Sequence, residues 1–129
     1  MSSSFAQSQA QLAGIAQQHA ELRAAVDAGE LWMDADVAER AATRCDQAVK
    51  ELDDWLAGAE VLTRKRKFGT NEDGEAAAEA FAQAGREYLD TLKNAQRVIA
   101  NMAETFRAAG RTAAQADEAG QQMIRGTGE

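Results

Sequence analysis

Apolar and small side chains recur three and four positions apart from Ala78 to Met123, for about six heptads, without a slip in phase. This spacing places them along one side of a helix, because an α-helix completes a turn every 3.6 residues. The chain contains no proline that would interrupt such a helix. The pattern therefore predicts one helix from about Gly74 to Ile124, roughly 75 Å long at 1.5 Å per residue.

Two shorter stretches show the same periodicity. The first predicts a helix from Phe5 to about Ala28, with Ser4 as its N-cap. The second predicts a helix from Ala35 to about Lys65, with Asp34 as its N-cap. Their apolar stripes do not share one phase, so we expect a break between the two helices from Gly29 to Met33.

The sequence RKRKFGTNEDGEAAAEAF connects the second and third predicted helices. Turn-forming residues from Phe68 to Gly74 indicate a reversal of the chain. Gly69 suits the left-handed conformation that ends a helix, and Thr70 or Asp73 can cap the next one. The cations Arg64–Lys67 fall in the predicted last turn of the second helix, where they would offset its dipole. Contact with a partner is their alternative role.

These elements predict an all-α fold. We expect a long antiparallel helix-turn-helix hairpin, coiled-coil-like, with an additional N-terminal helix. The predicted division is an N-terminal helix over residues 1–28 and a hairpin over residues 29–129 that ends in a short flexible tail. No segment alternates apolar and polar residues with the period of a β-strand. The first helix can either pack beside the hairpin or project from it as a kinked arm.

About half of the positions on the predicted stripes of the second and third helices are alanine or glycine. The large residues that we expect in the helical seam, or against a partner, are Leu52, Trp55, Leu62, Phe81, Tyr88, Leu92, Ile99, Met102 and Phe106. The apolar residues that we expect at a further interface are Leu12, Ile15, Leu22, Trp32, Val49, Leu56, Leu89 and Val98.

An alanine-lined seam stabilises a hairpin only modestly. Burial contributes about 25 cal/mol per Å² of apolar surface, whereas ordering one residue costs about 1–2 kcal/mol. The predicted hairpin therefore needs more cover than its own two helices provide. Either the first helix or a protein partner supplies that cover, and a partner would complete a four-helix bundle.

Composition and charge argue against several classes of function. The formal net charge is −7, so the chain has no general attraction to nucleic-acid phosphates. No apolar run approaches the roughly 20 residues that a membrane span requires. The first residues, MSSSFAQSQAQLAG, show neither the positive region nor the apolar region of a secretory signal peptide, so we expect none.

No catalytic or metal-binding pattern includes His19 or Cys45. A di-iron helical bundle requires Glu-x-x-His, and Ala16 stands where the glutamate would be. A cysteine nucleophile requires a histidine base and an orienting group. We expect His19 to be packed or interfacial and Cys45 to be a small core residue. We predict no catalytic residue, metal site or cofactor, and a protein that is not an enzyme.

Three stretches resemble the WXG100-like proteins of type VII secretion, in their actinobacterial branch. They are GELWMDADVAERA at 29–41, the pair Phe68-Gly69 at the turn, and MAETFRAAGRTAAQAD at 102–117. In that family Trp-x-Gly marks the turn, and here Phe68-Gly69 stands in its place. The family's export motif is Tyr-x-x-x-Asp/Glu. Asp117 fits the acidic position, whereas Ala113 occupies the tyrosine position.

The resemblance implies a protein that pairs through its helices for co-export or delivery. Its partner would be a second small hairpin protein or the N-terminal region of a toxin, in a heterodimer, with a homodimer as the other possibility. The chain would be cytoplasmic before export, then secreted or held at the cell surface. Because the tyrosine is missing, the alternative is a cytosolic coiled-coil adaptor or chaperone that is not itself exported.

Overall fold

The computed structural model describes the backbone of residues 4–65 and 67–127, and the side chains of residues 5–65 and 67–120. The described elements are α1 (Ser4–Asp27), α2 (Ala35–Ala59), the 3₁₀ helix η1 (Glu60–Thr63) and α3 (Glu72–Thr127). No β-strand occurs in these ranges. The predicted all-α class and the three long helices are confirmed.

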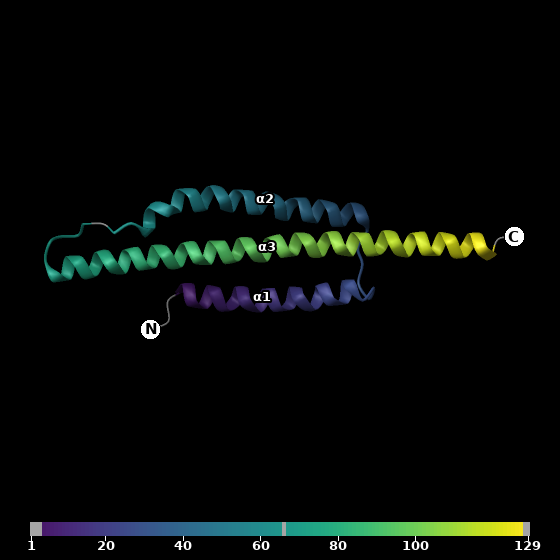
Figure 1. Ribbon diagram of the computed structural model, residues 1–129, viewed down its shortest axis with the longest axis horizontal. Helices are drawn as coiled ribbons and strands as arrows, with labels where there is room; N and C mark the ends of the chain where they lie inside the picture. The colour runs from purple at the N-terminus through teal and green to yellow at the C-terminus, as the bar shows by residue number, and fades with distance from the viewer. Residues whose placement is uncertain (1–3, 66, 128–129) are drawn as a thin grey trace.

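Helix α3 lies between α1 and α2, which pack on its opposite sides (Figure 1). Helix α2 runs antiparallel to α3, and α1 runs parallel to it. Within the described residues, no Cα of α1 comes within 8 Å of a Cα of α2. The three helices therefore form a layer one helix thick, in which α1 packs beside α3 rather than projecting as an arm. The C-terminal end of α3 extends past both neighbours.

Helix α1 ends on the predicted glycine. Gly29 has a φ of +78°, a conformation that glycine adopts without a Cβ penalty. Its N–H donates to the Val26 carbonyl at 3.0 Å, and the Glu30 N–H donates to the Ala25 carbonyl at 2.9 Å. This is the Schellman arrangement of a helix C-terminus. Asp34 then caps α2, because its side chain accepts the N–H groups of residues 36 and 37.

Helix α2 ends earlier than predicted. It stops at Ala59 and tightens into η1, after which Arg64 adopts an extended conformation. The Leu62 backbone lies against α3 at Gly85, where a Cβ would come within 2.0 Å of the Leu62 carbonyl oxygen. The dipole role predicted for Arg64, Lys65 and Lys67 is therefore wrong, since these cations follow the helix instead of forming its last turn. Arg66 lies outside the described residues.

Helix α3 begins at Glu72, and its cap is neither of the predicted residues. Asn71 Oδ1 accepts the Gly74 N–H at 2.7 Å, and the Asn71 carbonyl accepts the Glu75 N–H at 3.1 Å. Asn71 therefore accepts N–H groups at the start of α3, the capping role that we predicted for Thr70 or Asp73. Gly69 does have a positive φ, +123°, but it lies in the connection and does not end α2.

Small side chains fill the contacts between the helices, as the sequence predicted. Ala42 is 0% exposed, and Ala38, Ala82 and Ala103 are similarly buried. A Cβ on Gly110 would lie 2.9 Å from the Ala38 Cβ. Without these small residues α2 and α3 would be forced apart, because each position leaves no room for a larger group.

Because α3 lies between two neighbouring helices, its buried residues differ from those that the sequence predicted. Leu89 and Val98, predicted beside the seam, are each only 9% exposed, whereas the seam residues Trp55 and Phe81 are 62% and 64% exposed. A helix between two neighbours buries two opposite lines of side chains. The predicted stripe lies between those lines, so much of it remains open. Trp32 also stays exposed, in the connection between α1 and α2.

Candidate protein–protein interface

Contacts along α3 show where its two open sides lie. Gln96 donates to the Val49 carbonyl on α2 at 3.0 Å and to Asp53. Two residues earlier, Asn94 donates to Gln9 on α1. Side chains two positions apart point in nearly opposite directions on a helix. The intervening Ala95 therefore lies on one open side of the layer, and Lys93 lies on the other.

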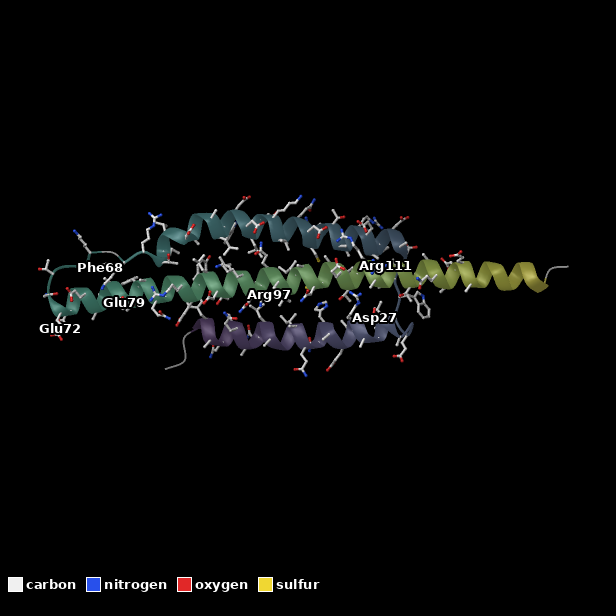
Figure 2. The ribbon with its side chains drawn as sticks, viewed as in Figure 1. Asp27, Phe68, Glu72, Glu79, Arg97 and Arg111 are labelled. Atoms are coloured by element: carbon white, nitrogen blue, oxygen red, sulfur yellow. The ribbon has the colours of Figure 1, made fainter. Side chains whose placement is uncertain are left out.

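The open side that includes Lys93 is polar. Charged residues of α3 recur along it, and we call this side the polar face: Glu79, Arg86, Asp90, Lys93, Arg97, Glu104 and Arg111. Figure 2 labels three of them at intervals along α3. Shallow grooves between α1 and α3 open on this side, lined by Ala13 and Ala20 together with Arg97 and Glu104.

The opposite side carries the predicted stripe and no charged residue of α3 between Phe81 and Phe106. Ile15 and Leu22, both exposed, flank it on the side of α1 turned away from the polar grooves. We call this surface the apolar face and define it by Ile15, Leu22, Ala48, Leu52, Trp55, Tyr88, Leu92, Ala95, Ile99, Met102 and Phe106. Helical periodicity predicted the large residues among these positions but not which of them stay exposed.

A groove crosses the apolar face between α2 and α3. It encloses about 290 Å³ and is lined by Ala48, Leu52 and Trp55 on one wall and by Leu92 and Ile99 on the other, with Glu51 at its edge. The indole of Trp55 is 62% exposed beside it. Exposed tryptophan next to an apolar groove is typical of anchoring positions at protein interfaces.

An aromatic cleft continues the apolar face toward the start of α3. It encloses about 590 Å³. Its lining consists of Phe5, Leu62, Arg64, Phe68, Phe81, Ala84, Gly85 and Tyr88. The Phe68 and Phe81 rings stack with centroids 5.1 Å apart, and the Phe5 and Tyr88 rings lie 5.9 Å apart in a tilted arrangement. Phe68 thus brings the connection before α3 (Figure 2) into contact with the helix.

A network of ion pairs joins α2 and α3 at the edge of their contact that borders the polar face. Arg107 donates to Asp46 at 2.7 Å and to Glu39 at 3.3 Å. The hydrogen bond from Arg107 lowers the pKa of Asp46, and the same bond together with that to Glu39 raises the pKa of Arg107. These charges connect α2 to α3 on the side away from the apolar face.

Cys45 and His19 lie on different helices, α2 and α1, which pack on opposite sides of α3. Cys45 is half-buried, and burial, followed by the charge of Asp46, raises the pKa of its thiol. A raised pKa leaves less of the nucleophilic thiolate at neutral pH. His19 packs in the contact between α1 and α3 with its Nδ1 buried. Among the described side chains, no three His, Cys, Asp or Glu residues gather as metal ligands.

The residues that carry the family resemblance occupy different environments. Phe68 lines the aromatic cleft, and Gly69 bends the connection behind it. Asp117 is exposed in the C-terminal part of α3, whereas Ala113 is 8% exposed. Among the predicted interface positions, Leu12, Val49 and Leu56 are half-buried. No described helix contains an apolar stretch of the length needed for membrane crossing.

The chain exposes more surface than a globular protein of its size. Its accessible surface is 9210 Å², whereas the relation for globular monomers gives roughly 6600 Å² at 13.8 kDa. The difference exceeds the roughly 800 Å² that each partner buries in a standard interface. A layer with one apolar face therefore has ample surface for a partner to cover.

Comparison with known proteins gives no match: no family model, curated protein or solved structure matches the chain.

Proposed function

We propose that this protein acts by helix-to-helix pairing in type VII secretion, with its apolar face as the pairing surface. The observation that carries the pairing is that the face is continuous and lacks α3 charges, while Trp55, Ile15 and Leu22 stand exposed on it. Covering such a face removes apolar area from water, which is the main favourable contribution to protein association.

The assignment to type VII secretion is supported by the resemblance of three stretches of sequence. In this proposal α2, α3 and the connection containing Phe68-Gly69 form the WXG100-like hairpin, and α1 is an addition that lengthens the apolar face. The partner is a second small hairpin protein or the helical N-terminal region of a toxin. The pair would leave the cytoplasm together, by a route that needs no signal peptide.

A cytosolic adaptor or chaperone is the second candidate. The environment of the partial export motif favours it, because Asp117 is exposed while the tyrosine position is taken by the buried Ala113. The chain thus offers only the acidic half of the motif. In the first proposal the partner would carry the complete motif; in the second, the chain would deliver a cargo and remain inside the cell.

The pairing is tested by placing a charge on the apolar face. Leu92 and Ile99 are half-buried there and line the groove beside Trp55. We expect Leu92→Asp or Ile99→Asp to abolish co-purification of the partner from the native host, because a carboxylate would be left unpaired in the contact. Lys93→Asp, on the polar face, is the matched control and should retain the partner. Helical circular dichroism identifies any variant that fails to fold.

Export is tested separately in a strain whose type VII system is active. The first proposal expects the chain outside the cell together with its partner, and retention of both when the system is inactivated. A chain that pairs through the apolar face but is found only in the cytosol would reject export and support the adaptor.

A further inference from the structure

Two exposed charges of opposite sign stand at the edge of the apolar face, with no ion-pair partner among the described residues. Arg44 and Glu51 are seven residues apart on α2, and neither forms an ion pair or a side-chain hydrogen bond in the described structure. Their neighbours three and four positions away carry no opposite charge either. Both lie beside Ala48, on the flank of α2 that borders the groove at Trp55.

This spacing is self-complementary. When two copies of one helix pack antiparallel about a two-fold axis, residues equally distant from the axis on either side face each other. An axis between Gln47 and Ala48 places Arg44 opposite Glu51 of a second copy, and Glu51 opposite its Arg44. The two ion pairs form together, because each is the symmetry mate of the other.

The large residues of α3 fit the same axis. Gln96 contacts Val49, and Gly85 contacts Leu62, so the α3 residue level with the middle of α2 is close to Ile99. Leu92 and Phe106 lie seven positions before and after Ile99. A two-fold axis at this level sets Ile99 against Ile99 of the second copy, and Leu92 against its Phe106. Charge pattern and apolar pattern thus share one centre.

We infer that a second copy of this chain covers the apolar face, packed antiparallel across a two-fold axis that passes near Ala48 and Ile99. The surface in excess of a globular monomer exceeds what a standard interface needs from each partner. The inference rests on the apolar face being the pairing surface, as in the proposed function, but not on secretion. A helical partner would displace the second copy to reach the same face.

Charge exchange at Arg44 and Glu51 tests the dimer by analytical ultracentrifugation of the full chain. Arg44→Glu and Glu51→Arg each turn two symmetry-related attractions into repulsions. We expect each variant alone to dimerise about tenfold more weakly, since exposed pairs change affinity by a few-fold each. An equimolar mixture of the two variants should recover wild-type affinity, because both ion pairs are attractive in the mixed dimer. The double variant should recover it as well.

Arg97→Glu makes the same change of charge on the polar face and should dimerise like the wild type. A wild-type chain that stays monomeric at about 100 µM overturns the inference, and so does a mixture that associates no better than its components. A monomeric chain that still binds a partner through Leu92 would reject the dimer and keep the proposed function. If the dimer shows the expected charge dependence but no partner co-purifies from the native host, the dimer is kept and the proposed pairing with a partner is rejected.

Discussion

Among the described glycines, Gly85 is the one at which an added Cβ would meet the shortest contact. A Cβ there would lie 2.0 Å from the Leu62 carbonyl oxygen and 2.5 Å from its carbonyl carbon, and real Cβ contacts are essentially never shorter than 3.0 Å. The backbone of η1 would have to retreat by about 1 Å, because α3 is a continuous helix with little freedom to bend. Gly85→Ala therefore separates η1 from α3 and opens the base of the aromatic cleft.

Two opposing contributions determine the size of the effect. Alanine in a helix interior is favoured over glycine by about 1 kcal/mol, while overpacking of a tight contact costs about 1–3 kcal/mol. We expect Gly85→Ala to lower the free energy of unfolding by up to about 2 kcal/mol, the difference between these two contributions. For a chain of this length that corresponds to a fall in Tm of up to about 8 °C.

Gly14→Ala is the matched control, since a Cβ on Gly14 in the middle of α1 meets nothing within 4 Å. It should gain about 0.5–1 kcal/mol and raise Tm by a few degrees. Thermal unfolding followed by circular dichroism at 222 nm compares the two variants with the wild type. Equal Tm values for Gly85→Ala and Gly14→Ala would refute the close approach of η1 to α3.

Three further predictions concern single side chains. Asp34→Ala should cost about 1 kcal/mol in urea unfolding, because α2 loses the cap that accepts two N–H groups; an unchanged midpoint would contradict the cap. The Arg107 hydrogen bond holds the pKa of Asp46 below its usual 3.8, so the ionised carboxylate stabilises the fold above that pH and the gain is lost as pH falls through the lowered pKa. Melting curves of wild type and Asp46→Asn should therefore differ at pH 6 and converge toward pH 2, and a constant gap would count against the pair. Burial raises the Cys45 pKa, so iodoacetamide should modify the thiol more slowly in the folded chain than in urea at pH 8, and equal rates would show an accessible thiolate.

Local signals in the sequence were sufficient for the helices and several of their ends. Asp34 and Gly29 act where their chemistry predicts, because a cap and a left-handed glycine depend on a few neighbouring residues. The same reasoning failed at the end of α2. The helix tightens before Arg64 because Gly85, more than twenty residues later in the chain, admits the Leu62 backbone. No residue pattern near position 60 predicts the contact between the Leu62 backbone and Gly85.

The candidate site divides in a similar way. Periodicity identified the apolar stripe of α3, from Phe81 to Phe106, and the edge residues Ile15 and Leu22. It could not show that these positions stay open, because a helical stripe looks the same whether one neighbour covers it or two neighbours flank it. The aromatic cleft was also missed, since Phe5, Phe68 and Phe81 come from distant parts of the chain.

The sequence alone determined the all-α fold class, the presence of the three long helices and the small side chains along their contacts, because backbone propensity and helical periodicity are local properties. Only the tertiary structure decided that α3 lies in the centre with α1 and α2 on opposite sides. That choice depends on which of several similar alanine-lined surfaces pack together, and the differences in free energy among them are sums over distant residues. It is this arrangement that leaves one side of the layer charged and the other apolar.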